Sequence, residues 1–112
     1  MDFLNTELMT QYKDMLGADM YQQTVDLYEQ QSQNYLTKLS DAVEQQDYDH
    51  WKDSCHILKS ASGNLGLKKV FEKVAELEYS KQDFAILATE LDALKVLNNA
   101  SMVALKEWLN QD

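Results

Sequence analysis

Apolar residues recur along the chain at steps of three and four, which is the spacing of one face of an α-helix. Breaks in this pattern divide the chain into five predicted helices. These helices span residues 5–16, 19–46, 48–65, 67–79 and 84–110. Because the predicted connections are short, neighbouring long helices should run antiparallel. We therefore expect an all-α fold, an up-and-down antiparallel four-helix bundle with a short additional N-terminal helix.

Residues that favour helix ends stand at several predicted boundaries. Gly17 and Gly66 are expected to end the first and third helices, because glycine readily adopts the left-handed conformation found there. Asp47 is expected to cap the third helix. Asp19 followed by Gln22 has the spacing of a capping box, which predicts the start of the second helix.

Two polar residues interrupt the predicted core-facing stripes. Ser32 falls on the apolar face of the second helix, and Asn98 falls on that of the fifth. If Asn98 faces inward, it needs a buried partner or water. The stripe of the fourth helix is uninterrupted and predicts these core residues: Leu67, Val70, Phe71, Val74 and Leu77.

The composition limits the class of protein. The chain has 112 residues, which suits a single domain over residues 1–112. Nineteen acidic residues against ten basic ones give a net charge of −9, so nucleic acid is not an expected partner. The single cysteine, Cys55, suits a reducing compartment. With no signal peptide and no apolar run long enough to insert into a membrane, we expect a cytoplasmic location.

The predicted third helix carries the candidate chemistry. On a helical wheel His56 points away from the core, while its neighbour Cys55 points into it. Lys59, Ser60 and Gly63 lie on the same side as His56, within two turns. A glycine inside a helix costs about 0.5–1 kcal/mol relative to alanine. We interpret Ser60 and Gly63 as keeping the surface beside His56 low, so that a partner can approach closely.

The combination of His56 and Lys59 indicates a surface that accepts a phosphoryl group. A neutral imidazole is a good nucleophile near neutral pH, and a phosphorylated one gains negative charge. Lys59, one turn away, is expected to pair with that charge. Its positive charge should also favour the neutral, nucleophilic form of the free imidazole.

The sequence HILKSASGNLGL, residues 56–67, resembles the signature of histidine-containing phosphotransfer (HPt) domains. The resemblance rests on a lysine three residues after His56, Gly63 at seven and Gly66 at ten. The family more often has glycine at the position of Ser60. The stretch VAELE, residues 74–78, also resembles the next helix of the family.

The resemblance implies a phosphorelay intermediate of two-component signalling rather than an enzyme. His56 would accept a phosphoryl group from the aspartate of a response-regulator receiver domain and pass it to another response regulator. A hybrid sensor histidine kinase is a further expected partner. The resemblance implies no metal or cofactor of its own, with Mg²⁺ supplied by the receiver. Lys52, Asp53 and Ile57 are candidate docking residues, although Ile57 could equally lie at the edge of the core.

Other functions are weighed against this one. A docking module could keep the scaffold and bind a receiver without phosphotransfer, although it would not need His56 and Lys59. A self-sufficient kinase or phosphatase is the weakest reading, because no nucleotide-binding motif is present. The adjacent Cys55 and His56 diverge by about 100° on a helix, which disfavours a zinc site. His50 is read as incidental. We expect a monomer, and the sequence leaves open whether the domain stands alone or belongs to a hybrid kinase.

Overall fold

The structure, a computed structural model, describes residues 3–110 and contains five helices in that range. Its helices are α1 (Thr6–Leu16), α2 (Ala18–Gln45), α3 (Tyr48–Leu65), α4 (Lys68–Glu78) and α5 (Phe84–Leu109). Every predicted helix is present with ends within one residue of the prediction. The prediction of a single domain over 1–112 extends to residues 1–2 and 111–112, which lie outside the described residues.

Local capping explains where several helices begin and end. The side chain of Asn5 accepts a hydrogen bond from the Leu8 amide at 3.1 Å, and that of Asp47 accepts one from the His50 amide at 3.0 Å. These bonds satisfy amides that have no partner within the helix. Gly66 ends α3 with φ of 84°, a left-handed conformation that glycine adopts without strain.

The start of α2 differs from the prediction. The helix begins at Ala18, so Asp19 lies inside its first turn and is not the N-cap. Gly17 occupies that position with φ of 87° and makes no side-chain cap. The same residue ends α1 by donating its amide to the Lys13 carbonyl at 2.8 Å. One glycine therefore closes one helix and opens the next, which leaves no room for a separate capping box.

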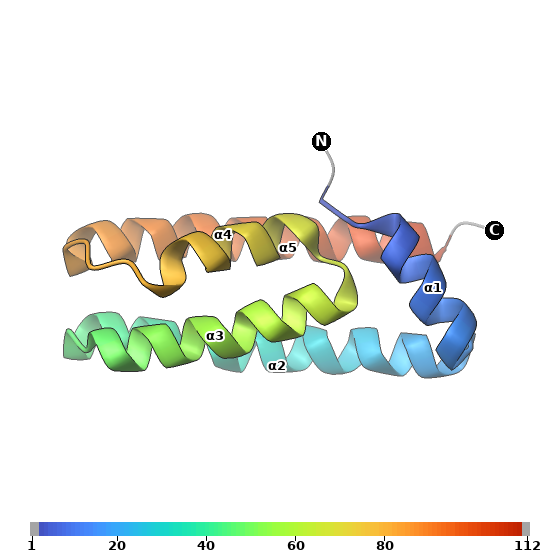
Figure 1. Ribbon diagram of the computed structural model, residues 1–112, viewed down its shortest axis with the longest axis horizontal. Helices are drawn as coiled ribbons and strands as arrows, with labels where there is room; N and C mark the ends of the chain where they lie inside the picture. Colours follow the sequence, from blue (N-terminus) through green and yellow to red (C-terminus); the bar gives the residue numbers. More distant parts are fainter. Residues whose placement is uncertain (1–2, 111–112) are drawn as a thin grey trace.

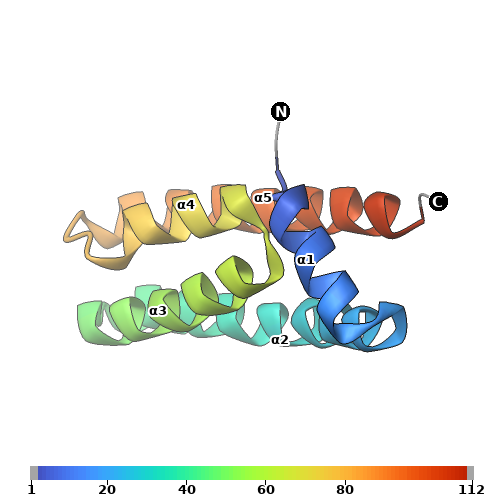
Figure 2. The same ribbon diagram turned by 45° about the vertical axis from the view of Figure 1, so that its right-hand side comes forward.

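Helices α2, α3, α4 and α5 form the predicted up-and-down bundle (Figure 1). Helices α3 and α4 lie side by side and form one layer, with α2 and α5 behind them. Because α3 and α4 are the shorter pair, they leave one end of the bundle uncovered, and α1 crosses it (Figure 2). A hydrogen bond of 2.8 Å from the Asn5 amide to the Gly66 carbonyl ties α1 to the turn between α3 and α4.

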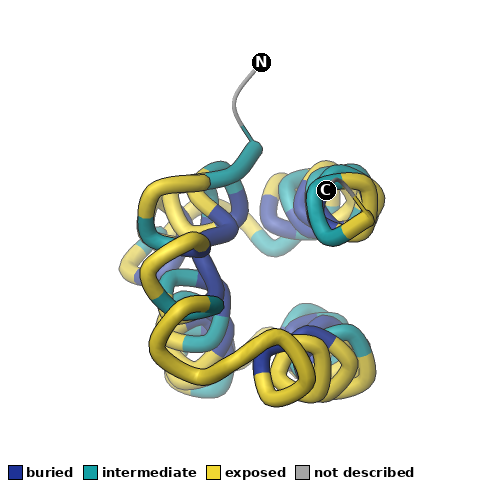
Figure 3. The backbone as a smooth tube through the Cα atoms, turned by 90° about the vertical axis from the view of Figure 1, so that its right-hand side faces the viewer, coloured by how far each residue is buried: buried dark blue, intermediate teal, exposed yellow. Residues whose placement is uncertain are grey.

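The core runs along the whole bundle, with buried positions facing the centre in the view along its axis (Figure 3). Trp51 is fully buried, and its indole nitrogen donates a 2.9 Å hydrogen bond to the Leu77 carbonyl, which joins α3 to α4. Leu67 lies in the core as predicted. Phe71 does not: it is 40% exposed, so its assignment to the core stripe of α4 was wrong.

The polar residues that interrupt the stripes meet inside the bundle. The hydroxyl of Tyr28 donates a 2.7 Å hydrogen bond to Asn98 Oδ1, and Asn98 Nδ2 lies 3.3 Å from Ser32 Oγ. All three side chains are buried. The predicted need for a buried partner at Asn98 is thus met by two residues of α2, which join α2 to α5.

Candidate functional site

His56 lies in the middle of α3 with its side chain turned outward. The side chain is 62% exposed, whereas that of the preceding Cys55 is fully buried. The wheel-based prediction that His56 points away from the core is therefore confirmed. Its imidazole is open to a partner from the solvent side.

One ring nitrogen of His56 is held by Glu78, the last residue of α4. His56 Nδ1 lies 3.1 Å from Glu78 Oε2, and the Glu78 side chain is only 2% exposed. An ionised carboxylate only accepts hydrogen bonds, so Nδ1 carries the proton of the neutral imidazole. The other nitrogen, Nε2, then has a free lone pair and is the nucleophilic atom of the ring.

Lys59 contacts the same carboxylate. Its Nζ lies 2.5 Å from Glu78 Oε1, and its side chain is 25% exposed. Burial alone would raise the pKa of Glu78, but hydrogen bonds from Lys59 and His56 outweigh it and hold that pKa below its ordinary value. The hydrogen bond to Glu78 likewise raises the pKa of Lys59. Glu78 is therefore ionised at neutral pH and bridges the two residues.

This bridge changes the expected role of Lys59. The sequence analysis assigned its charge to the phosphoryl group and to the control of the free imidazole. In the structure the ammonium is paired with Glu78, so the free His56 faces an ion pair and not an isolated positive charge. Lys59 lies one turn after His56 on α3, and Glu78 Oε2 lies 3.1 Å from the ring. Both charges are therefore close enough to interact with a group attached at Nε2.

A shallow hollow of about 340 Å³ surrounds His56. Three of the predicted docking residues line it together, and two residues that the sequence analysis did not select complete it. The lining residues are Lys52, Asp53, His56, Ile57, Glu78 and Tyr79. Ile57 is 42% exposed and Tyr79 is 69% exposed, so the hollow has apolar walls open to solvent. Ile57 is therefore not part of the core, and its role in docking stays a prediction.

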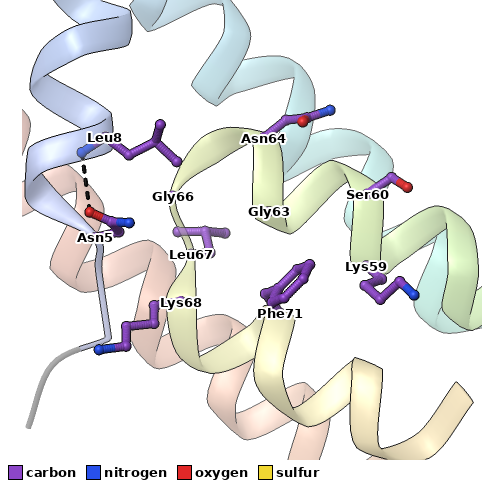
Figure 4. A pocket seen from close by; sticks show the side chains of 10 residues that line it. All are labelled: Asn5, Leu8, Lys59, Ser60, Gly63, Asn64, Gly66, Leu67, Lys68 and Phe71. Atoms are coloured by element: carbon purple, nitrogen blue, oxygen red, sulfur yellow. Dashed lines mark hydrogen bonds between the residues drawn. The ribbon is translucent and has the colours of Figure 1, made fainter.

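A second hollow, of about 420 Å³, lies toward α1 (Figure 4). Its walls include Lys59, Ser60, Gly63 and Phe71. The predicted site residues therefore divide between two hollows. Lys59 connects the two, because it lines the second hollow and contacts Glu78, which lines the hollow around His56. Both hollows open on the layer formed by α3 and α4.

The structure gives Gly63 a different reason from the one predicted. A Cβ atom at this position would lie 2.8 Å from Cδ2 of Phe71, which is closer than such atoms approach. The Phe71 ring therefore lies directly against Gly63 and occupies the place that a side chain at this position would need (Figure 4). An effect of Gly63 on the approach of a partner stays a prediction, and it would act through the position of Phe71.

The sequence analysis missed the importance of Glu78. One signal for it was available: Glu78 follows Val74 by four residues and Leu77 by one, so it falls within the apolar arc of its helix. A carboxylate on an apolar arc needs a buried partner. The identity of that partner depends on how α4 packs against α3, which the sequence pattern of either helix alone does not contain.

The remaining candidates have structural roles or none. Burial, together with the charge of Glu78, raises the pKa of Cys55 to about 12, so its thiol stays protonated. His50 Nδ1 lies 3.4 Å from Gln45 Oε1 near the start of α3, away from the two hollows. Among residues 3–110 no three side chains of the metal-binding types are grouped to hold an ion.

Charge is distributed unevenly between the layers. Helix α3 carries two lysines and two acids, and α4 carries three of each, so both are formally neutral. Helix α2 carries five acids and one lysine. The two helices of the layer that carries His56 are thus neutral together and contain half of the ten lysines, although the chain as a whole is strongly acidic.

Comparison with known proteins agrees with this geometry. A family model described as Hpt domain matches residues 23–111, most of the chain. The fold is similar to that of the histidine-containing phosphotransfer domain of ArcB from Escherichia coli, with a TM-score of 0.84. The match covers 96% of this chain and 92% of that one, at 17% sequence identity. No curated protein sequence matches the chain.

The helical bundle, with an exposed histidine held by a neighbouring helix, agrees with the family match. The chain belongs to the histidine-containing phosphotransfer (HPt) family, as the family match over residues 23–111 shows. This membership gives it a phosphotransfer role in two-component signalling, where HPt domains are carriers and not kinases in themselves. None of the helices described in residues 3–110 has the length and apolar character to cross a membrane.

Proposed function

We propose that this protein is a phosphorelay intermediate in which His56 Nε2 carries the phosphoryl group. The observation that carries the proposal is the hydrogen bond between His56 Nδ1 and Glu78, because it leaves Nε2 unprotonated and directed to solvent. The donor is the phosphorylated aspartate of one receiver domain, and the acceptor is the aspartate of another response regulator. A hybrid sensor histidine kinase supplies the first receiver.

The transfer step needs no general base from this chain. The lone pair of Nε2 attacks phosphorus, and the bond between phosphorus and the aspartate oxygen breaks, so that the carboxylate leaves with its electron pair. The ring becomes positively charged, with a proton on Nδ1 and the phosphoryl group on Nε2. Glu78 lies 3.1 Å from that proton and stabilises the charge as it develops. The reverse of the same step delivers the group to the second aspartate.

Lys59 is proposed to serve both states of the site. Before transfer it pairs with Glu78 and keeps that carboxylate ionised. After transfer its partly exposed ammonium lies one helical turn from His56, where it can approach a phosphoryl oxygen. The Mg²⁺ that the reaction requires is proposed to come with the receiver domain, and the cell compartment is proposed to be the cytoplasm, where Cys55 stays reduced.

The receiver is proposed to dock over the hollow around His56. The exposed side chains of Ile57 and Tyr79 supply apolar contact there, and Lys52 and Asp53 supply charges at its edge. The formal neutrality of α3 and α4 favours approach of an acidic site, and α2, with five acids and one lysine, lies in the other layer. Rim charges of this kind act mainly on encounter rate and specificity.

The test is phosphoryl uptake from phosphorylated receiver domains in the presence of Mg²⁺, followed by intact mass and by the stability of the adduct in acid and base. We expect one phosphoryl group that is labile in acid and stable in base. His56→Gln should abolish the adduct, and His50→Gln is the matched control that should retain it.

Two outcomes would redirect the assignment. A histidine adduct that persists in His56→Gln would show that the wrong residue has been chosen. Binding of receivers without any adduct would favour the docking module, the alternative in which the scaffold is kept without phosphotransfer. Because His56 donates to the buried carboxylate of Glu78, His56→Gln should lower the free energy of unfolding by no more than about 1.5–3 kcal/mol. Native helicity of the variant under the assay conditions would show that loss of the adduct does not reflect unfolding.

A further inference from the structure

Two charged residues beside His56, Lys52 and Asp53, make no ion pair within residues 3–110. Both line the hollow around His56. They do not pair with each other, because consecutive residues of a helix diverge by about 100°. The other carboxylate of the hollow, that of Glu78, is already paired with Lys59. Within the described chain, Lys52 and Asp53 therefore supply the unpaired charges of this hollow.

The direction of helical side chains places the His56 ring over these two residues. Side chains on an α-helix lean toward its N-terminus, so each covers the turn that precedes it. For His56 that turn contains Lys52 and Asp53, four and three positions earlier. The two hollows agree with this, because Lys59 and Ser60, on the following turn, line the second hollow and not the one around His56. A group attached to the exposed ring therefore lies beside the turn of Lys52 and Asp53.

Lys59 is tied to a second task that Lys52 does not have. Its ammonium holds Glu78, whose side chain is only 2% exposed. Moving Lys59 away would leave a buried carboxylate without its cation, which is strongly unfavourable. Lys59 therefore reaches a phosphoryl oxygen only while it keeps its contact with Glu78. Lys52 has no ion pair to give up within residues 3–110, so its ammonium is available to a negative group on the ring.

We infer that Lys52 is a second cation for the phosphoryl group on His56 Nε2, and that Asp53 opposes it. This inference rests on the proposed function and adds to it what sets the strength with which His56 holds the group. The ammonium of Lys52 pairs with phosphoryl oxygens, and the carboxylate of Asp53 repels them. Since Lys59 and Glu78 largely cancel as an ion pair, these two charges decide the balance.

The first test measures the ionisation of the phosphoryl group itself by ³¹P NMR. The chain has two histidines, so phosphorylation with phosphoramidate in the His50→Gln background modifies His56 alone. A nearby cation favours the more negative form of the phosphoryl group. Lys52→Gln should therefore raise the pKa of that group by about 0.2–0.7, the range expected for a solvent-exposed ion pair. Asp53→Asn should lower the same pKa.

The second test measures how the phosphoryl group divides at equilibrium between His56 and the aspartate of a receiver domain, with Mg²⁺ present and both proteins dilute enough to be mainly dissociated. Lys52→Gln should shift the equilibrium toward the receiver by about 1.5- to 5-fold, and Asp53→Asn should shift it toward His56. The equilibrium compares the free proteins before and after transfer. A change in docking affinity alters the rate but leaves this ratio unchanged.

Two control variants accompany both tests. Lys52→Arg keeps the charge and should retain the native pKa and equilibrium. Lys68→Gln removes an exposed lysine of α4 that lies ten residues before Glu78, which is about 15 Å along the helix and beyond the screening length of about 8 Å at physiological ionic strength. It should change neither quantity.

The outcomes separate this inference from the proposed function. A native pKa and a native equilibrium in Lys52→Gln would overturn the inference, even if transfer became slower, because a docking role alone changes only the rate. Phosphoryl uptake at His56 would in that case still support the proposed function. If receivers failed to phosphorylate the chain, the proposed function would be contradicted, and the measurement with phosphoramidate would still decide whether Lys52 contacts the group.

Discussion

Glu78 Oε2 lies 3.1 Å from His56 Nδ1, although the two residues are 22 positions apart and belong to different helices. The contact joins the exposed nucleophile to one of the most deeply buried charges of the bundle. Lys59 completes it from the other oxygen of the same carboxylate. The buried carboxylate of Glu78 therefore determines which ring nitrogen of His56 carries the proton, while the His56 side chain itself is exposed to solvent.

The first prediction concerns this carboxylate. Glu78→Gln should let the proton of His56 occupy either ring nitrogen, and it removes the negative charge that stabilises the phosphorylated ring. A hydrogen bond to a charged group contributes about 1.5–3 kcal/mol, so transfer should slow by about 10- to 100-fold. The tautomer is read from ¹⁵N shifts of the imidazole, and the transfer rate from single-turnover phosphorylation.

Glu76→Gln is the control, because Glu76 is a well-exposed carboxylate on the same helix. It should change neither the ¹⁵N shifts nor the rate. Glu78→Gln with native shifts and a native rate would show that the contact with His56 does not position the ring. A lower rate with unchanged receiver binding would separate a positioning role from a docking one.

The second prediction concerns Gly63 and Phe71. Gly63→Ala should gain about 0.5–1 kcal/mol of helix propensity, but its Cβ meets the Phe71 ring at 2.8 Å. The gain should therefore appear in full only in a Phe71→Ala background. Urea unfolding of the four proteins in this cycle measures the difference. Ser60→Ala, an exposed change on the same helix, should have the same effect in both backgrounds.

The same pair bears on transfer. Gly63→Leu should displace Phe71 and crowd the surface next to Lys59, so that transfer from a receiver slows even though helix propensity improves. If transfer is unchanged in this variant while the unfolding cycle shows coupling, Gly63 serves only the packing of α3 against α4.

The third prediction concerns the buried polar network. Tyr28→Phe removes the donor to Asn98 Oδ1 and leaves that oxygen buried without it. We expect a loss of about 1–3 kcal/mol in the free energy of unfolding. Tyr35→Phe removes a hydroxyl that contacts Gln31 on the exposed side of the same helix, and it should change stability by less than about 0.5 kcal/mol. Equal effects of the two changes would contradict the importance of the network.

The fourth prediction concerns alkaline pH. Burial raises the pKa of Tyr21 to about 12 and that of Cys55 to about 12, and it raises the pKa of Tyr28 as well. In the unfolded chain tyrosine titrates near 10 and cysteine near 8.5. Between these pH values and about 12 the unfolded state holds fewer protons than the folded one, so stability falls as pH rises.

Each group contributes a slope of up to about 1.4 kcal/mol per pH unit within this window. Urea midpoints at a series of pH values measure the slope. Tyr21→Phe removes one of the three groups and should make the decline shallower. A stability that is flat from pH 9 to about 11 would contradict the burial of these groups.

The sequence pattern was sufficient to predict the architecture, because the ends and the buried face of each helix are encoded by residues within or next to that helix. Gly66 and Asp47 mark ends through local capping, and the apolar period marks the inward face. The failure at Asp19 has a local cause as well: Gly17 serves both adjoining helices, so the second starts earlier than a capping box would place it.

The site was predicted in part for the same reason. The outward direction of His56 follows from its own helix, and the structure confirms it. The contacts with Glu78 and the cover of Phe71 over Gly63 arise between helices α3 and α4. Their rotation and distance depend on packing of the whole core, which no single-helix pattern specifies.

Asn98 lies seven residues from a leucine on either side, Leu91 and Leu105, and all three face the core. If α5 slid along α2 by two turns, about 10 Å, apolar surface would still meet apolar surface. The hydroxyl of Tyr28 would then face a leucine and have no acceptor. Apolar contact alone would allow several alignments of α5 along α2. The Asn98 side chain, through its hydrogen bond with Tyr28, therefore selects one of them.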